Sequence, residues 1–426
     1  MFRFAATSMP VNLTRLGVVA LACATLTLSG CGGGSRAKDY QPDSVVSFGD
    51  ENSLLESYAS TTLDPAGSAS KTIQGLVYTV NAVATGSVNY CTDTTANTLC
   101  SNPITTTVSN YAPGTLHGYY FDSVNNHTTA DNVVTFIDVG TGDYAAGTGQ
   151  TLKRTVDRIY SCASSVLWNQ VIAHSFNKGF GSVCALDVDG ASTYATYGAK
   201  VADLQAQISA NRGRLGEGVL VTIMIGQNDI LEVYNRVQHA SPTPIGGDDP
   251  MQIMAARGAT VAAIVKDVLS TGAKVVLALT PDLGQSPLAG KTGESQTLLS
   301  QYTREFNRNV KTALGSDTAQ DGRHLALVDT DLFTNPITRS SAYNYNTAVC
   351  LSSGLSRPDG SAVQSTDADV VAGANLVSKQ VKYCNASTLV TNGSTSTYIW
   401  ADDVHYAPAG HGLAGSLGAS RAFNQF

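Results

Sequence analysis

Three short stretches of the chain combine residue types that together can transfer an acyl group. Asp402 stands three residues before His405, so its carboxylate can accept the imidazole Nδ1–H and leave Nε2 free to act as a general base. Asn228 can donate its side-chain amide to a developing oxyanion, and Gly198 lets a backbone N–H approach a ligand closely. An Asp-x-x-His spacing alone is more often a surface ion pair. The prediction therefore depends on all three stretches meeting at one site.

A fourth stretch, residues 44–55, could supply the nucleophile. Its β-branched and aromatic residues form a predicted strand that stops at Gly49-Asp50, and Asn52 and Ser53 open what we expect to be a helix. Such a corner places a side chain at the carboxyl end of a strand and at the positive end of a helix, where an attacking oxygen is favoured. Ser53 is the candidate nucleophile of this corner.

Alternating helices and strands must position these stretches. From residue 166 onward, apolar residues at helical spacing alternate with continuous apolar runs, which are typical of strands buried on both faces. We predict helices at residues 167–173, 201–208, 251–270 and 294–314, and strands at 218–225, 274–279 and 325–329. This alternation indicates an α/β fold with a mainly parallel sheet, in which functional groups gather at the carboxyl ends of the strands.

The chain of 426 residues is long enough for one large domain with an inserted second part. Residues 61–160 are rich in Thr, Asn, Ser, Gly and Tyr, and we interpret them as a β-rich insertion. The predicted main domain therefore comprises residues 44–60 and 161–426. A net charge of −7 without a basic block gives no reason to expect a nucleic-acid partner.

The four stretches, in this order, resemble the sequence blocks of the GDSL-type lipases and esterases, also called SGNH hydrolases. The matching segments are Phe48-Gly49-Asp50 for the first block, Gly198-Ala199 for the glycine block, Gly226-Gln227-Asn228-Asp229 for the Gly-x-Asn-Asp block, and Asp402-Asp403-Val404-His405 for the Asp-x-x-His block. The resemblance covers residues 44–58 and 166 to the end. It implies a three-layer α/β/α sandwich, and none of the motifs calls for a metal or another cofactor.

The resemblance also implies a role for each block in the hydrolysis of carboxylic esters. His405 would act as the base, oriented by Asp402, and a serine would be the nucleophile. The Gly198 N–H, the Asn228 amide and the nucleophile's own N–H would form the oxyanion hole. Small esters, lipids and acetylated glycans all suit this chemistry as substrates.

The first block departs from the family pattern at the nucleophile. The family has its serine directly after Gly-Asp, where this chain has Glu51, and Ser53 follows two residues later. On a regular helix a two-residue step turns a side chain by about 200° and advances it by about 3 Å, so only a lengthened turn would bring Ser53 to His405. We predict a serine esterase with Ser53 as the displaced nucleophile.

Two alternatives remain open. Glu51 could occupy the serine position beside His405, where its carboxylate would pair with the imidazolium and raise its pKa, leaving either water-activated hydrolysis or no catalysis. Otherwise the chain is a surface lipoprotein that keeps the scaffold without its catalysis and binds a glycan or an acyl chain at Gly198 and Asn228.

The N-terminus has the pattern of an export signal that ends at a lipidated cysteine. Arg3 and Arg15 precede the apolar residues 16–28, and Leu28-Ser29-Gly30-Cys31 resembles the bacterial lipobox. We predict a signal peptide over residues 1–30 and a membrane anchor through lipid on Cys31. The alternative is an ordinary secretory signal with a free Cys31.

The residues after Cys31 bear on where the anchor lies. We predict a flexible tether over residues 31–43, because Gly32-Gly33-Gly34-Ser35 favours a mobile chain. Gly32 does not resemble an inner-membrane retention signal. We therefore expect an exported protein in the cell envelope, anchored in the outer membrane of a Gram-negative bacterium.

Six cysteines remain after the signal peptide and Cys31 are set aside, and an even number in an exported chain favours disulfides. Closeness along the chain favours the pairs Cys91–Cys100, Cys162–Cys184 and Cys350–Cys384. A zinc site is the weaker alternative, because the sequence has no Cys-x-x-Cys pair.

Overall fold

The structure, a computed structural model, describes residues 40–60, 71–82, 86–91, 103–108, 119–122, 127–129, 166–184, 189–241, 243–315, 323–336, 339–355, 357, 363 and 379–426. The chain divides into two compact units, Met1–Tyr40 and Gln41–Phe426, and every described helix and strand belongs to the second. The predicted signal peptide, Cys31 and the tether up to residue 39 lie outside the described residues. Within the described ranges, no helix is long and apolar enough to cross a membrane.

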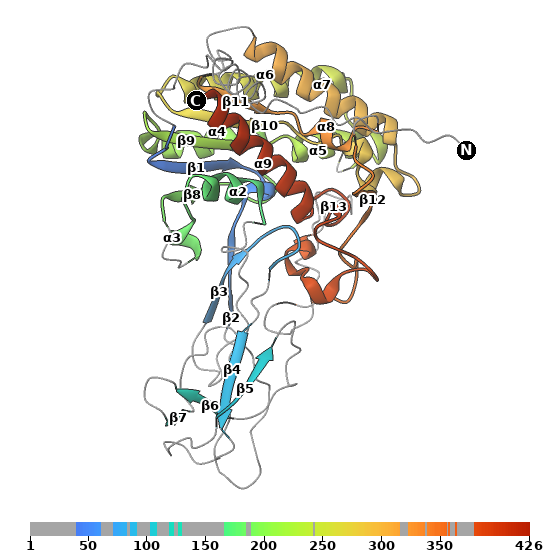
Figure 1. The fold of residues 1–426 in the computed structure, drawn as a ribbon. Helices are drawn as coiled ribbons and strands as arrows, with labels where there is room; N and C mark the ends of the chain where they lie inside the picture. Colours follow the sequence, from blue (N-terminus) through green and yellow to red (C-terminus); the bar gives the residue numbers. More distant parts are fainter. Residues whose placement is uncertain are drawn as a thin grey trace, which may run out of the picture. The chain divides into compact units, whose positions relative to one another are not determined.

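A five-stranded parallel sheet organises the main domain (Figure 1). In the order β11-β10-β9-β1-β8, its strands are β11 (Leu325–Val328), β10 (Lys274–Ala278), β9 (Val219–Met224), β1 (Ser44–Gly49) and β8 (Ala191–Thr193). The predicted α/β fold with a mainly parallel sheet is confirmed. The three strands predicted at residues 218–225, 274–279 and 325–329 agree with the observed bounds to within one residue.

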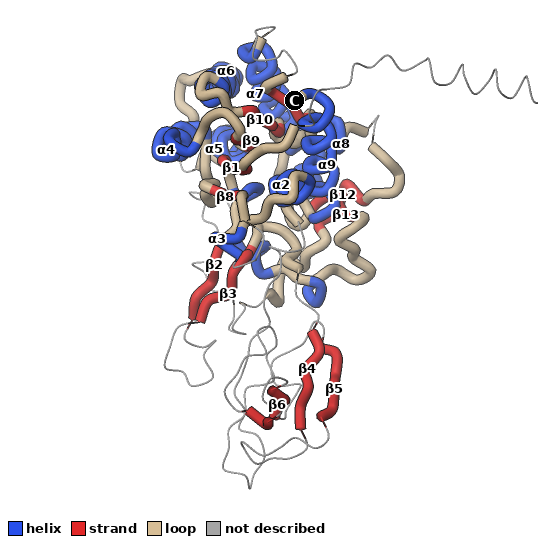
Figure 2. Tube along the Cα trace, turned by 60° about the vertical axis from the view of Figure 1, so that its left-hand side comes forward, coloured by secondary structure: helices blue, strands red, loops and turns tan. Residues whose placement is uncertain are grey.

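Helices cover both faces of the sheet, so that the sheet is the middle of three layers (Figures 1 and 2). One core cluster joins apolar residues of the sheet to four helices: α4 (Val201–Asn211), α5 (Gln227–Gln238), α6 (Pro250–Leu269) and α7 (Gln296–Leu314). On the other face, α2 (Trp168–Ser175) packs against α9 (Pro408–Gln425), and Gly418 of α9 lies against Ile172 and Val276. The implied α/β/α sandwich is therefore present.

The register of the central strands brings the first block and the Gly-x-Asn-Asp block side by side. β1 and β9 pair from Ser44 with Val219 to Gly49 with Met224, so both strands end at the same level. Asp50, directly after β1, and Gly226, two residues after β9, therefore lie at the carboxyl edge of the sheet, as the sequence predicted.

Shorter elements make up the rest of the described chain. The remaining strands are β2 (Glu56–Ser60), β3 (Lys71–Leu76), β4 (Gly86–Cys91), β5 (Pro103–Val108), β6 (Tyr119–Asp122), β7 (His127–Thr129), β12 (Asn344–Ala348) and β13 (Tyr398–Trp400). The short helices are α3 (Gly181–Cys184), α8 (Asp331–Thr334) and the 3-10 helices η1 (Glu51–Ser53), η3 (Arg212–Arg214), η4 (Leu283–Gln285), η5 (Pro287–Gly290), η8 (Lys379–Tyr383) and η9 (Ala386–Thr388). Strands β3 to β7 all fall in the range predicted as a β-rich insertion.

One predicted element is wrong, because no α-helix lies between β1 and β2. The chain makes the single turn η1 and is extended again at Leu54, from which β2 continues antiparallel to β3. Residues 54, 55 and 58 have helical spacing, but β3 supplies a strand partner that the local pattern does not reveal. The corner therefore has no helix N-terminus to favour an anion.

The disulfide Cys350–Cys384 is present, as predicted from the closeness of the two residues along the chain. The other two predicted pairs, Cys91–Cys100 and Cys162–Cys184, involve side chains outside the described part of the structure. They stay predictions.

Candidate active site

The carboxylate of Glu51 lies at the point where the predicted site residues meet. Its Oε2 accepts hydrogen bonds from the Gly198 backbone N–H at 2.9 Å and from Asn228 Nδ2 at 3.0 Å. Asn228 Nδ2 also lies 3.1 Å from Oε1, and Gln227 Nε2 lies 3.3 Å from the same oxygen. The two donors predicted for an oxyanion hole, Gly198 and Asn228, therefore point at one carboxylate oxygen.

His405 reaches the same carboxylate from the C-terminal loop. Its Nε2 lies 3.4 Å from Glu51 Oε1, and its Nδ1 lies 2.7 Å from Asp402 Oδ2. The backbone N–H groups of Val404 and His405 donate to Asp402 Oδ1 at 2.9 and 2.7 Å, so a tight turn aims this carboxylate at the ring. The side chains of Glu51 and His405 are completely buried.

Glu51, His405 and Asp402 form a row of charges. Burial alone would lower the pKa of His405, but the charges and hydrogen bonds of Asp402 and Glu51 raise it to about 10. Burial alone would raise the pKa of Glu51 and of Asp402, but the charge and hydrogen bonds of His405 hold both below their usual values. The two carboxylates thus favour the imidazolium form of His405, which already holds the proton that a general base would accept.

Asp50 and Gln207 hold the turn that presents Glu51. Asp50 Oδ1 accepts hydrogen bonds from the Asn52 N–H at 3.1 Å and from Asn52 Nδ2 at 3.0 Å. Gln207 of α4 donates to the Gly49 carbonyl and accepts from the Gly49 N–H, both at 2.9 Å. Gly49 has φ +129°, and a Cβ there would meet the β9 backbone at 1.9 Å, so only glycine lets β1 end this close to β9.

The glycine block and the Gly-x-Asn-Asp block are tied to each other. Asn228 Nδ2 lies 3.1 Å from the Ala199 carbonyl oxygen, and Asp229 Oδ2 accepts from the Val201 N–H at 3.0 Å. Burial raises the pKa of Asp229 to about 6, although the charge of Arg257, 3.3 Å away, opposes the rise. These contacts hold the two donors of the hole at a fixed separation.

Ser53 has other partners than His405. Its hydroxyl accepts a hydrogen bond from Trp168 Nε1 at 3.0 Å. Its carbonyl accepts from Asn169 Nδ2 at 3.0 Å and from Thr193 Oγ1 at 2.7 Å, and the residue is fully buried. The hydroxyl therefore anchors η1 to α2.

The geometry of η1 explains why Ser53 and Glu51 point in different directions. In a 3-10 turn a two-residue step rotates the side chain by about 240°, so Glu51 faces the hole while Ser53 faces α2. Both ring nitrogens of His405 face carboxylates. The structure thus does not bring the predicted nucleophile Ser53 to the base, and it gives Glu51 the position beside His405 that the first alternative expected.

Residues 76–81, which we call the strap, also contact the site. The ring centre of Tyr78 lies 4.7 Å from that of Tyr197 and 6.2 Å from that of His405. Thr79 Oγ1 donates to the carbonyl of Tyr406 at 2.7 Å. All six strap residues are buried. This part of the predicted insertion therefore belongs to the core around His405.

Two anchors hold the strap in place. Tyr78 donates its hydroxyl to Glu56 Oε1 at 2.9 Å, and Lys382 Nζ lies 3.1 Å from Glu56 Oε2. The Asn81 N–H donates at 2.8 Å to the carbonyl of Cys384, which is one half of the disulfide. The strap is thus fixed both to β2 and to the segment around η8.

Three residues contribute to the site without having been predicted. Gln227 stands inside the Gly-x-Asn-Asp block, so its place after a strand could have marked it. Trp168 meets Ser53 across 115 residues of sequence, and Tyr78 reaches His405 from a range that showed no chemical pattern. Neither aromatic residue carries a local signal.

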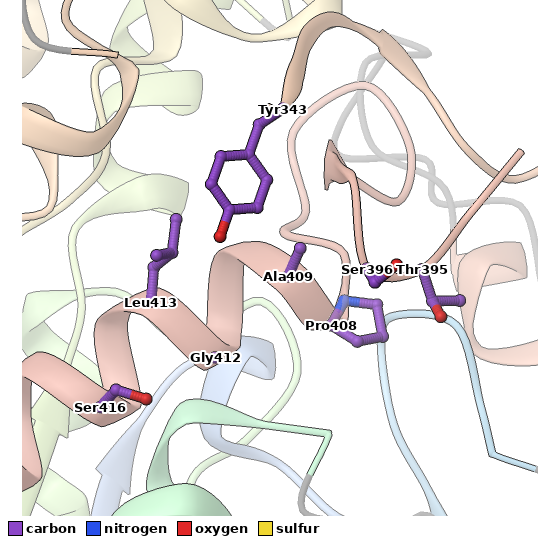
Figure 3. Close-up of a pocket in the computed structure, with 8 residues that line it drawn as sticks. All are labelled: Tyr343, Thr395, Ser396, Pro408, Ala409, Gly412, Leu413 and Ser416. Atoms are coloured by element: carbon purple, nitrogen blue, oxygen red, sulfur yellow. The ribbon is translucent and has the colours of Figure 1, made fainter. Parts of the chain in front are cut away.

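A surface hollow at the start of α9 does not include these residues (Figure 3). It has a volume of about 430 Å³ and lies between Tyr343 and the first turns of α9, at Pro408 and Leu413. Neither Glu51 nor His405 lines it. In the part of the chain that the structure describes, no group of three His, Cys, Asp or Glu side chains is placed to hold a metal ion.

Residues 148–417, more than half of the chain, match the family model of the GDSL-like lipases and acylhydrolases. The match begins after the first block. It therefore includes the glycine, Gly-x-Asn-Asp and Asp-x-x-His blocks but not the turn at Glu51. No curated protein matches the chain.

Solved structures of similar proteins include the acetylxylan esterase Axe2 of Geobacillus stearothermophilus, with 12% identity over 67% of this chain and 82% of that one, at a TM-score of 0.30. They also include a member of the lipolytic G-D-S-L protein family from Veillonella parvula, with 14% identity over 60% of this chain and 93% of that one, at a TM-score of 0.28. These likenesses are distant, and the family match carries the assignment.

Proposed function

Because the chain belongs to the GDSL-like lipases and acylhydrolases, a family of ester hydrolases, we propose that it hydrolyses carboxylic esters at the site formed by Gly198, Asn228, His405 and Asp402. Water is the attacking group in this proposal. Small esters, lipids and acetylated glycans are the proposed substrate classes.

One observation carries the proposal, namely that two hydrogen-bond donors converge on a single oxygen. The Gly198 N–H and Asn228 Nδ2 reach Glu51 Oε2 at 2.9 and 3.0 Å. These distances fall within the range of about 2.7–3.1 Å that a working oxyanion hole requires. An ester carbonyl oxygen in the place of Oε2 would be polarised by both donors, with its carbon beside His405 Nε2.

The first step requires Glu51 to withdraw from the hole. Without that negative charge, the pKa of His405 falls toward the range in which a neutral imidazole serves as a base. His405, with Nδ1–H donated to Asp402, takes a proton from water while the water oxygen bonds to the carbonyl carbon. The carbonyl oxygen becomes an oxyanion held by Gly198 and Asn228.

The second step breaks the ester C–O bond. The imidazolium of His405 gives its proton to the leaving alcohol oxygen, and the carbonyl re-forms as a carboxylic acid. One ester and one water thus give one alcohol and one acid, and His405 is neutral again. The acid then ionises to a carboxylate.

Water is favoured over Ser53 because the serine hydroxyl is already bound. It accepts the Trp168 indole hydrogen bond in a fully buried position, while His405 Nε2 faces Glu51. No acyl-enzyme forms in this route, so the new oxygen of the acid comes directly from solvent.

Hydrolysis of p-nitrophenyl acetate by the full-length chain tests the proposal. We expect His405→Ala to abolish the activity and Ser53→Ala to retain it, and we expect a fluorophosphonate probe to leave the wild type unlabelled. Activity that survives His405→Ala would overturn the site. Loss of activity in a folded Ser53→Ala variant, together with probe labelling of Ser53 in the wild type, would replace water by a serine nucleophile.

We also propose that the protein works at the cell envelope, anchored by lipid on Cys31 in an outer membrane. This proposal rests on the sequence around Cys31. A palmitate analogue fed to cells should label the wild type and not Cys31→Ser. Equal labelling of the two chains would contradict it.

A further inference from the structure

The carboxylate of Glu51 has the contacts of a bound ligand rather than those of a structural side chain. Its hydrogen-bond donors are the Gly198 N–H, Asn228 Nδ2, Gln227 Nε2 and the ring of His405. They come from three separate places: the glycine block, the first turn of α5, which supplies both Gln227 and Asn228, and the C-terminal loop. All converge on a single group that is completely buried.

This arrangement matches the one that the acid product of ester hydrolysis would adopt. Oε2 lies in the hole, where the carbonyl oxygen would be, and Oε1 lies toward His405, where the attacking oxygen would be. The side chain therefore presents a carboxylate to the site in the orientation of a product.

We propose that the hole of this protein is a binding site for monocarboxylates, that Glu51 is its built-in occupant, and that this occupant holds the resting chain in an inhibited state. The inhibitory part rests on the proposed ester hydrolysis. The binding part rests only on the contacts of the carboxylate.

The charged groups around the hole favour a simple monocarboxylate, which carries one negative charge and no positive group. His405 faces Glu51 from the C-terminal loop, with Asp402 on its other side. Asp50 precedes Glu51 as the N-cap of η1, and the ring of Tyr78 lies beside His405 in the strap. Burial and the charge of Glu51 raise the pKa of Asp50, and burial together with the charge and hydrogen bond of Glu56 raises the pKa of Tyr78, which favours the neutral form of both groups. The imidazolium is then the cation that an incoming carboxylate must pair with.

This charge balance makes binding depend on pH. When Glu51 is absent, a neutral His405 must take up a proton as the carboxylate enters, because the pair is stable only as imidazolium and anion. A carboxylate should therefore bind a Glu51-truncated chain more tightly as the pH falls from 8 to 6.

Truncation of Glu51 allows the occupant to be supplied from solution. Glu51→Ala removes the atoms of an acetate group, and Glu51→Gly removes those of propionate. We expect acetate, in the millimolar range, to raise the Tm of the full-length Glu51→Ala chain and to shift the His405 ring signals in its NMR spectrum. Acetamide has the same shape without the charge and should bind at least tenfold more weakly.

The two truncations also provide matched controls for each other. Glu51→Ala should prefer acetate and Glu51→Gly should prefer propionate, whereas the wild type should respond to neither because its hole is filled. If the glycine variant does not fold, the comparison of acetate with acetamide in Glu51→Ala decides alone. No response of Glu51→Ala to acetate, or an equal response of the wild type, would overturn the proposal.

Activity measured in parallel separates this proposal from the proposed function. If Glu51→Ala binds acetate and no form of the chain hydrolyses esters, the carboxylate site stands and the proposed function fails. If the wild type hydrolyses esters but Glu51→Ala does not respond to acetate, the function stands and the built-in occupant is refuted. Inhibition is supported if acetate slows hydrolysis by Glu51→Ala and leaves the wild type unchanged.

Discussion

The proposed oxyanion hole and the turn η1 lie side by side, yet they differ in how closely they follow the GDSL pattern. Gly198, Asn228 and His405 have the residue types and the order that the family shows, and the structure brings them together. In η1, Glu51 stands where the family has a serine. The comparison teaches that donors in this arrangement can be held around a residue other than the serine of the family pattern.

The physical reason is that the hole donors need a partner whatever the chemistry. A buried N–H without an acceptor costs about 1–3 kcal/mol, and a carboxylate satisfies several donors at once. Glu51 therefore stabilises the arrangement that it blocks. The predictions below test this contrast between a retained hole and an altered turn.

The largest effect is expected from restoring the family residue. Glu51→Ser removes the carboxylate from the hole, lowers the pKa of His405 toward that of a base, and places a hydroxyl directly after Gly-Asp. General acid–base catalysis contributes about 10²–10⁴-fold, so kcat/KM for p-nitrophenyl acetate should rise by about 10²-fold or more. The double variant Glu51→Ser/His405→Ala is the control and should lose this gain. A folded single variant with unchanged activity would show that the hole is no longer competent.

The next effect concerns pH. The pKa of His405 is raised to about 10 from its ordinary 6.5, so its proton contributes stability that is fully present below pH 6.5 and is lost as the pH rises through about 10. Glu51→Gln keeps the shape and removes the charge. The alkaline loss of stability should therefore move down by about 1–3 pH units, as measured by urea unfolding at a series of pH values.

A surface charge change provides the control for that experiment. Glu305→Gln removes a carboxylate from the ion pair with the exposed Arg308 on α7 and should leave the pH profile as it is. If stability depends on pH in the same way in Glu51→Gln and in the wild type, the charge of Glu51 does not raise the pKa of His405.

A smaller effect is expected on the other side of the turn. Ser53→Ala leaves the buried Trp168 Nε1 without its acceptor, so the free energy of unfolding should fall by about 1–3 kcal/mol. Adding Trp168→Phe also removes the unpaired indole N–H. The double variant should therefore lose less free energy of unfolding than the sum of the losses of the two single variants. Strict additivity would show that the hydrogen bond between these residues is not what holds η1 to α2.

The smallest effect is expected at the strap. Tyr78→Phe keeps the ring beside His405 and removes only the hydroxyl that donates to Glu56, which remains paired with Lys382. The free energy of unfolding should fall by about 1 kcal/mol, and kcat should stay within about twofold of the wild type. A large drop in kcat in this variant, with the fold intact, would assign the hydroxyl a part in the reaction.

Much of the hole could be predicted because short-range patterns place it. The apolar runs of β9 and β10 fix two neighbouring strands, so Asn228 had to lie at the carboxyl edge of the sheet. The three-residue spacing from Asp402 to His405 allows a turn that one carboxylate can hold. In both cases the information lies within a few residues of the functional group.

The turn could not be predicted in the same way. Whether residue 51 or residue 53 faces the hole depends on η1 being a 3-10 turn, and that depends on β3 pairing with β2 and on Trp168 holding Ser53. These partners are far away in sequence and carry no spacing signal. The sequence identifies the residue after Gly-Asp as Glu51, but long-range contacts decide that its side chain points into the hole.

The hydrogen bond from the Asn81 N–H to the carbonyl of Cys384 joins the strap to a segment that the Cys350–Cys384 disulfide holds. In the export that we propose, thiols stay reduced in the bacterial cytoplasm, so before export the segment that receives this bond is not cross-linked to Cys350. The strap, which places Tyr78 beside His405, would then be joined to a cross-linked segment through Asn81 only after this export. In this proposal the surroundings of His405 are completed only in the oxidising compartment that forms the Cys350–Cys384 disulfide.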